Sequence, residues 1–382
     1  MTRLHHVFHA GVEDRPGTAL ALLHAWIAAS RHRHRVTVLG PSPVIDEARQ
    51  LGLPLAAAMG APHGLATMAA PAIAGVLSRE PSPDAVVCWS LGAMQAVRLI
   101  SPKRPATLCQ TTRPAPREAR RLASLMSRRR APTAVVCFSP GTAETLVDAG
   151  CLNEGLHVVR PGVEPGLLET SDRHALRRSW GVVDPETPVA IALTTPPLAA
   201  DAERAGLALG MAAEAMGNPG SLRQSIRLLC HPHQLRRELA QRVLGDIDMP
   251  DLIVQEPQVA TPWLVLPGVD VALVFGHHGD RLARAWAMTA GRPLVAGPRS
   301  GAMDDIRHEE HALLAKSHAP RDFAHCIKQI LEDRPRAAGL GERAAARAGE
   351  RFDPATMARR LDDITVATHA PGDPEVARSR HA

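Results

Sequence analysis

The sequence contains no tyrosine, and aromatic residues make up only 3% of its 382 residues. Single-stranded nucleic-acid sites usually combine basic side chains with aromatic rings on which the bases stack. Lysine is also scarce, with only Lys103, Lys316 and Lys328 among the 44 basic residues. The net charge of +5 comes from arginines spread along the chain, which together with abundant alanine indicates GC-rich coding bias. We therefore expect no nucleic-acid partner.

Long apolar segments are missing as well. Residues 51–78 carry no Asp, Glu, Lys or Arg, but Pro54, Pro62 and Pro71 interrupt them, and proline disfavours a continuous lipid-facing helix. We expect a buried strand, a loop and a helix in this stretch. The N-terminus lacks the apolar run of a signal peptide. These features predict a cytoplasmic chain without a transmembrane segment.

No two of the six cysteines are spaced as a CxxC redox or zinc pair. Two of them follow apolar runs, in Ala-Val-Val-Cys88 and Ala-Val-Val-Cys137, where a cysteine usually acts as a small buried hydrophobe. Free thiols in a reducing compartment are therefore expected.

What the sequence does contain is an alternation of short apolar runs with amphipathic helical stretches, which indicates parallel sheets with crossover helices. The first series of expected strands is Leu4–His9, Val36–Leu39, Ala85–Trp89, Ala106–Gln110, Ala134–Ser139 and His157–Pro161. The second series is Val189–Leu193, Ile226–Cys230, Leu252–Gln255, Val269–Phe275, Pro293–Ala296 and Ala312–Lys316.

Two such series predict an α/β protein with two doubly wound, Rossmann-like domains. We expect them at residues 1–166 and 185–352, followed by a C-terminal helix at 353–367 that packs back on the first domain and a flexible tail at 368–382. Ligands of such sheets bind outside the carboxyl ends of the strands. Two domains facing a cleft would hold a substrate between them.

Six segments, in chain order, carry a resemblance: His9–Ala19, Arg31–Leu39, Val136–Glu164, Ala175–Val182, Ala287–Ala296 and Gly349–Leu361. Together they resemble the GT-B glycosyltransferases of the group 1 or family 4 type. The resemblance implies transfer of a sugar from a nucleotide diphosphate sugar to a glycan, lipid or small-molecule acceptor, with retention of stereochemistry. It implies no metal and no cofactor beyond the donor co-substrate. The basic clusters of the first domain leave open a peripheral contact with an anionic membrane.

The expected donor site departs from the family pattern. Alignment on Ala287-Met288 places His278 and Trp286 where the family has two glutamates. The segment Leu193–Ala200 holds no cation where the family has an arginine and a lysine. A diphosphate leaving group needs positive charge nearby, so other residues must supply it. Candidates on loops at strand ends, with His278 also the candidate catalytic residue, are His231, His233, His278, Gly279, Arg281, Trp286, Arg299, Ser300 and Gly301.

Competing interpretations remain open for these residues. The histidines and arginines are either a rebuilt phosphate site or solvated loop residues. On the acceptor side, Gly11, Arg15 and Gly17 either contact substrate or shape a surface turn. Pairs such as His231 and His233 lack the flanking ligands of a metal site. The run His308–His311 has the wrong order for a metalloprotease helix and is expected at the surface.

Two rival functions follow from the same residues. A catalytically inactive GT-B relative would act as a binding or scaffolding protein in glycan assembly, and loss of the family glutamates motivates this reading. A sugar-nucleotide epimerase would share the fold but needs acidic catalysts, which the sequence does not place.

Overall fold

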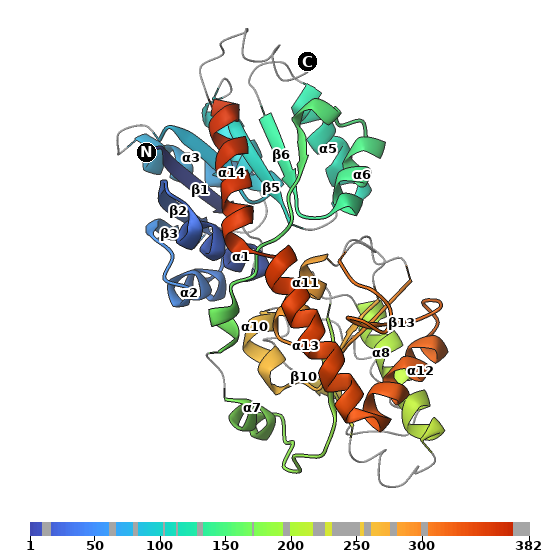
Figure 1. Cartoon of the computed structure of the whole chain (residues 1–382). Helices are drawn as coiled ribbons and strands as arrows, with labels where there is room; N and C mark the ends of the chain where they lie inside the picture. The colour runs from blue at the N-terminus through green and yellow to red at the C-terminus, as the bar shows by residue number, and fades with distance from the viewer. Residues whose placement is uncertain are drawn as a thin grey trace. The chain divides into compact units, whose positions relative to one another are not determined.

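The structure is a computed structural model of the chain (Figure 1). It describes residues 1–9, 17–60, 66–78, 83–101, 104–111, 114–127, 133–169, 172–193, 199–216, 226–230, 253–255, 261–275, 281–298 and 305–369. The chain forms two compact units: residues 1–138, 142–159 and 354–382 make the first, and residues 139–141 and 160–353 make the second. Each unit is described on its own.

The first unit is built on a seven-stranded sheet in the order β3-β2-β1-β4-β5-β6-β7, with every neighbouring pair parallel. The strands are β1 (Arg3–His9), β2 (Arg33–Leu39), β3 (Leu55–Met59), β4 (Ala85–Cys88), β5 (Ala106–Gln110), β6 (Thr133–Cys137) and β7 (Leu156–Val158). The helices are α1 (Gly17–Ala29), α2 (Ser42–Gln50), α3 (Ala66–Ser78), α4 (Leu91–Ile100), α5 (Pro116–Ser127), α6 (Pro140–Asp148) and α14 (Pro354–His369).

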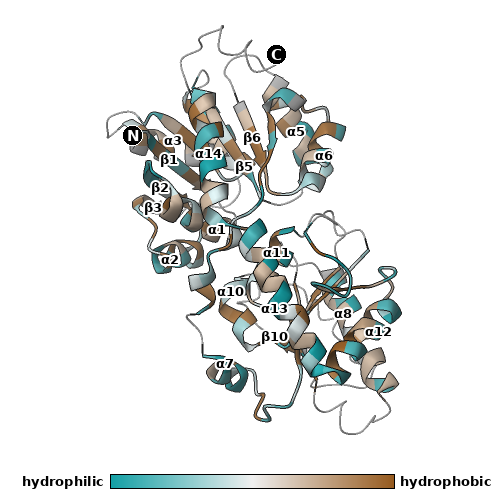
Figure 2. Cartoon of the chain, in the orientation of Figure 1, coloured by the Kyte–Doolittle hydropathy of each residue, from teal (hydrophilic) through white to brown (hydrophobic). Residues whose placement is uncertain are grey.

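The central strand β4 is apolar throughout, as expected for a parallel strand with helices on both faces of its sheet. All four residues of β4 are fully buried, and Figure 2 shows strands such as β5 as mainly hydrophobic. Leu122 of α5 and Leu146 of α6 belong to the same buried cluster as β4 and β5. The N-terminus of α4 is capped by Ser90, whose side chain accepts a hydrogen bond from the backbone N–H of Ala93, and such caps fix where a helix begins.

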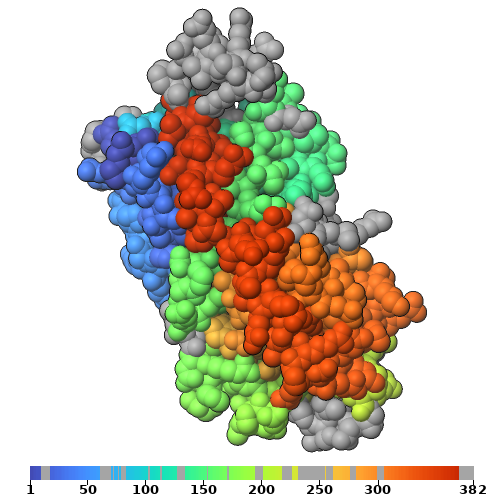
Figure 3. Space-filling view, in the orientation of Figure 1, coloured from blue at the N-terminus to red at the C-terminus, as the bar shows by residue number. Residues whose placement is uncertain are grey.

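The helix α14 belongs to the first unit although it lies at the far end of the chain. It packs against α1 and against β4, β5 and β6, and Figure 3 shows it in red along one face of this unit. Of the tail expected at 368–382, residues 368 and 369 belong to α14, and the rest lies outside the described residues.

The second unit is built on a six-stranded parallel sheet in the order β10-β9-β8-β11-β12-β13. Its strands are β8 (Val189–Ala192), β9 (Arg227–Cys230), β10 (Ile253–Gln255), β11 (Val271–Val274), β12 (Leu294–Ala296) and β13 (Leu313–Leu314). Its helices are α7 (Arg173–Ser179), α8 (Ala199–Ala215), α10 (Pro262–Val265), α11 (Arg281–Thr289), α12 (Pro320–Glu332) and α13 (Arg334–Arg351). Among the described residues, three short 3-10 helices span Asn153–Gly155 in the first unit, and Pro165–Leu168 and Leu266–Gly268 in the second.

Both sheets have the doubly wound order of Rossmann-like proteins, so the predicted fold class is confirmed. All twelve expected strands are present, and no strand end differs from the expected one by more than three residues. The stretch 51–78 contains a strand and a helix, but β3 is not buried as expected. It lies at the edge of its sheet, and each of its residues is half-buried or exposed. The sequence did not reveal this edge position because the alanine-rich strand carries no charged residue that would indicate exposure.

No helix among the described residues reaches the length and apolarity needed to cross a membrane.

Candidate functional site

The strand order locates a site in each unit. In a doubly wound sheet the strand order reverses between the first and fourth strands, and ligands bind at their carboxyl ends. In the second unit these strands are β8 and β11. The loops that follow them, 194–198 and 276–280, lie outside the described residues, so the described part of this edge comes from α11 and from the segments after β12 and β13.

A buried ion pair lies at this carboxyl edge. Arg281 is the first residue of α11, and its Nε donates a hydrogen bond of 2.8 Å to Oδ2 of Asp305. The Arg281 side chain is 5% exposed and that of Asp305 is fully buried. Asp305 follows the loop after β12. The pair therefore ties the start of α11 to the segment beyond the neighbouring strand.

Two further arginines surround the same carboxylate. The Nε atoms of Arg160 and Arg351 lie 3.7 Å and 3.6 Å from Oδ1 of Asp305. One carboxylate thus faces three guanidinium groups at this edge. The side chains of Arg160 and Arg351 are 43% and 25% exposed, so part of their positive charge reaches the surface.

Gly297 lies close to residues that follow β11 and β13, at the carboxyl ends of these strands. It follows β12, and a Cβ atom on it would lie 2.5 Å from the carbonyl oxygen of Phe275 and 2.8 Å from the ring of His318. Phe275 follows β11, and His318 lies four residues after β13. Because real Cβ atoms do not approach backbone oxygen so closely, this position requires glycine. His318 therefore also lies at the carboxyl edge of the sheet, and the sequence patterns did not identify it.

Trp286 lies in the interior of the second unit. Its side chain is 1% exposed, and its ring centroid lies 5.1 Å from that of Trp263. Its indole Nε1 is buried and has no hydrogen-bond partner among the described residues. A buried donor without a partner destabilises the fold by about 1–3 kcal/mol. Contact between Trp286 and a donor stays a prediction.

The remaining residues of the expected donor site lie outside the described residues: His231, His233, His278, Gly279, Arg299, Ser300 and Gly301. The same holds for Gly11 and Arg15 of the expected acceptor-side loop, whereas Gly17 begins α1. The structure therefore brings Arg281 to the carboxyl edge and leaves the roles of the others as predictions.

In the first unit the reversal of strand order lies between β1 and β4. The Oγ of Ser90, just after β4, donates a hydrogen bond of 2.9 Å to the backbone oxygen of His9, the last residue of β1. Gly92 approaches the same residue closely: a Cβ there would lie 2.7 Å from Nδ1 of His9. His9 and Gly92 are thus additional candidates at this edge, adjacent to the expected acceptor-side loop.

All six cysteines are buried and unpaired with one another. Burial raises the pKa of Cys230, which ends β9, to about 12. A thiol with such a pKa stays protonated at neutral pH and is a poor nucleophile.

The described part of the chain contains no group of three His, Cys, Asp or Glu side chains arranged to hold a metal. The expectation of a surface position for the run His308–His311 holds for His308 and Glu309, which are exposed. It is wrong for His311, which is buried because it packs within the turn and its Nδ1 accepts a hydrogen bond from the backbone N–H of Arg307.

No family profile matches the chain. Its sequence is 25% identical over 220 residues to a D-inositol 3-phosphate glycosyltransferase of Thermobispora bispora, a match that covers 55% of this chain and 50% of that protein. A protein of the same name from Corynebacterium aurimucosum is 33% identical over 78 residues, 20% of this chain and 18% of that protein. The chain thus spans at most about half the length of the curated relatives it matches.

Solved structures match over nearly the whole chain. HepE of Anabaena, crystallised with UDP and glucose, has a TM-score of 0.71 at 18% identity and covers 95% of this chain and 99% of its own. A glycosyltransferase of Rickettsia africae has a TM-score of 0.66 at 13% identity, over 97% and 99% of the two chains. WaaG, a glycosyltransferase of lipopolysaccharide biosynthesis, has a TM-score of 0.62 at 13% identity, over 95% and 99%. The chain has the GT-B fold and resembles, in fold and in sequence, glycosyltransferases of the group 1 type.

Proposed function

We propose that this protein transfers a sugar from a nucleotide diphosphate sugar to a glycan, lipid or small-molecule acceptor. The observation that carries the proposal is the arrangement of Arg160, Arg281 and Arg351 around the buried Asp305 at the carboxyl edge of the second sheet. In the resembling family a pair of cations after the first donor-domain strand neutralises the diphosphate, and the sequence lacks them there. Arg160, Arg281 and Arg351 at the same edge would supply the positive charge that neutralises the diphosphate.

The chemistry explains why this charge matters. When the bond between the sugar and the diphosphate breaks, negative charge develops on the leaving diphosphate, and fixed cations stabilise it. Arginine suits this role because its planar fork of donors pairs with phosphate oxygens and stays charged. Asp305 acts as a positioning residue, since it fixes the Nε of Arg281. His278 and Arg299 are the further candidates.

UDP-sugars are the first donors to test, because HepE was crystallised with UDP, with UDP-glucose, and with UDP and glucose. Inositol 3-phosphate is the first acceptor to test, because both curated relatives are named for it. The acceptor would bind near the end of β1, where the predicted contacts Gly11, Arg15 and Gly17 follow His9. A glycan or a lipid remains the alternative acceptor.

Retention of stereochemistry and independence of metal belong to the same proposal, since the resembling family has both properties. We expect turnover to persist in EDTA, and an NMR spectrum of the product should show the anomeric configuration of the donor. We also propose a cytoplasmic location, which agrees with six buried free thiols.

The test is release of UDP from UDP-glucose across a panel of acceptors, with labelled sugar followed into the product. Arg281→Gln and Arg351→Gln should each reduce turnover at least tenfold. The matched control is Arg343→Gln, because Arg343 is exposed on α13 and its Nε donates to a backbone oxygen at Glu310. Loss of turnover in the control to the same degree would contradict the role given to the cluster.

The second candidate is a catalytically inactive relative that serves as a binding or scaffolding protein. The segment Leu193–Ala200 holds no cation where the resembling family has an arginine and a lysine, and this loss favours the inactive relative. Nucleotide binding without turnover for any acceptor, in protein shown to be folded, would support it over the enzyme.

A further inference from the structure

A cavity of about 310 Å³ lies in the second unit, away from the carboxyl edge. Pro188, Asp270 and Pro293 line it, and each directly precedes a strand: β8, β11 and β12, respectively. Because these strands are parallel, the cavity lies at their amino ends, on the edge opposite Arg281 and Asp305. Nothing in the proposed transfer reaction uses this cavity.

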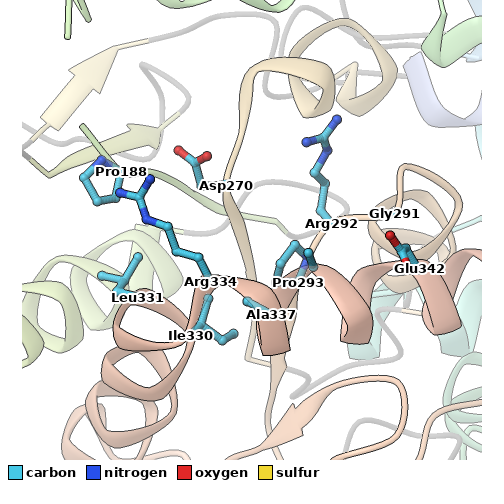
Figure 4. Close-up of a pocket in the computed structure, with 11 residues that line it drawn as sticks. Pro188, Asp270, Gly291, Arg292, Pro293, Ile330, Leu331, Arg334, Ala337 and Glu342 are labelled. Carbon is cyan, nitrogen blue, oxygen red and sulfur yellow. The ribbon is translucent and has the colours of Figure 1, made fainter. Parts of the chain in front are cut away.

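The corner between α12 and α13 closes the other side of the cavity (Figure 4). Ile330 and Leu331 come from the end of α12, and Ala337 comes from the second turn of α13. With Pro188 and Pro293 they give the cavity mostly apolar walls. Its volume lies at the lower end of the range for small-molecule sites, about 300–1,000 Å³. A cavity of this size suits a small ligand whose apolar part is about as large as one six-membered ring.

Two of the charged residues at the cavity already have partners. The carboxylate of Asp270 accepts hydrogen bonds from Nη2 of Arg173 at 2.6 Å and from Nη1 of Arg177 at 2.9 Å. Arg334 bonds to the carboxylate of Glu186 and, at 2.9 Å, to its backbone oxygen. One carboxylate thus serves two arginines, so Asp270 has little capacity left for a third cation.

The other cation that lines the cavity is Arg292. Its guanidinium makes no hydrogen bond or ion pair with any residue that the structure describes, and its Nε is buried. Burial lowers the pKa of Arg292, and the nearby charge of Arg173 lowers it further against the opposing effect of Asp270. In the view of Figure 4 Arg292 and Arg334 extend on either side of Asp270. The Arg292 side chain is half-buried and has no hydrogen-bonded carboxylate among the described residues, so an anion in the cavity would give it a direct partner.

We propose that this cavity binds a small organic anion, a carboxylate or a phosphate monoester on a body about the size of one ring, and that Arg292 pairs with its charge. A guanidinium binds either head group through two parallel hydrogen bonds. The apolar walls from Ile330, Leu331 and Pro293 cover the body. The site is independent of the donor nucleotide, because the two lie at opposite edges of one sheet.

The test is calorimetry on the full chain with phenyl phosphate, benzoate and the neutral benzyl alcohol at constant ionic strength. At least one of the anions should bind saturably at one site, and benzyl alcohol at least tenfold more weakly. Arg292→Gln should weaken binding of the anion at least tenfold. The matched control is Arg336→Gln, because Arg336 lies on α13 beside the lining residue Ala337 but pairs with Glu309 and does not line the cavity. This variant should bind the anion within twofold of wild type.

A second pair of measurements separates this site from the donor site and from a folding defect. Anion binding should persist in saturating UDP, and it should persist if UDP proves not to bind at all. The melting temperature of ligand-free Arg292→Gln should equal or exceed that of wild type, because the substitution removes a half-buried charge that has no hydrogen-bonded partner among the described residues. Unchanged affinity in Arg292→Gln, equal binding of benzyl alcohol, displacement by UDP, or no saturable binding of either anion up to millimolar concentration would each overturn the proposal.

Discussion

The indole Nε1 of Trp26 donates a hydrogen bond of 2.8 Å to Oδ1 of Asp362 and so joins α1 to α14 across 336 positions of the sequence. The hydroxyl of Ser30 donates to both oxygens of the same carboxylate at 2.9 Å. Asp362 is 4% exposed. A buried carboxylate thus holds the C-terminal helix on the face of the first sheet.

Removing this carboxylate should loosen α14. Asp362→Ala leaves the buried indole N–H without a partner, which costs about 1–3 kcal/mol. Hydrogen exchange of α14 peptides, followed by mass spectrometry, should accelerate in this variant. Asp363→Ala is the matched control because the adjacent Asp363 is exposed, and its exchange should match wild type. Equal exchange in both variants would mean that the hydrogen bond does not secure the helix.

The first unit should lose stability in acid. The indole N–H of Trp89 donates to Nδ1 of His6 at 3.2 Å, so the His6 proton sits on Nε2 and is donated to Nδ1 of His34 at 2.8 Å. Burial lowers the pKa of His6 well below its usual value and that of His34 to about 4. Burial likewise lowers the pKa of His5 to about 4. The fold therefore keeps these three rings neutral.

Because the unfolded chain binds these protons near pH 6.5 and the folded chain does not, stability is complete above pH 6.5 and falls toward pH 4. The expected slope is about 1.4 kcal/mol per pH unit for each histidine. Urea unfolding between pH 7.5 and pH 4.5 measures it. His34→Gln should give a shallower slope, whereas the exposed His325→Gln should not alter it. A slope that His34→Gln leaves unchanged would contradict this assignment.

Two glycines of α13 should respond oppositely to alanine. A Cβ on Gly341 would collide with the backbone oxygen of Gly291, which lies in the turn that ends α11 with φ +62°. Gly341→Ala should therefore destabilise the second unit by about 1–3 kcal/mol. A Cβ on the exposed Gly349 meets nothing within 4 Å, and Gly349→Ala should stabilise by about 0.5–1 kcal/mol. Thermal unfolding compares them, and a tolerated Gly341→Ala would disprove the backbone contact.

The sequence predicted the strands well because each parallel strand is a short apolar run between helices, a local pattern that needs no tertiary information. The prediction that β3 is buried was wrong, because a strand of small neutral residues has the same sequence pattern at the centre and at the edge of a sheet.

The residues of the candidate site were harder to predict from the sequence than the strands. Arg281 was identified through its position after β11, but its partner Asp305 was not, and neither were Arg160 and Arg351. These four residues are spread over 191 positions, from Arg160 to Arg351, and they meet only through the fold. His318 and Gly297 were missed for the same reason, since contact across strand ends leaves no local spacing. The unpartnered Arg292 also gave no signal, because an arginine after a glycine turn normally reaches solvent.

The most direct test of the proposed function is a thermal-shift screen of the protein against UDP, GDP, ADP and CDP, with calorimetry as confirmation. A nucleotide at about 100 times its dissociation constant stabilises the fold by about 2.7 kcal/mol. The account predicts selective stabilisation by UDP that is lost in Arg281→Gln and kept in Arg343→Gln. A flat response to all four nucleotides from folded protein would contradict it.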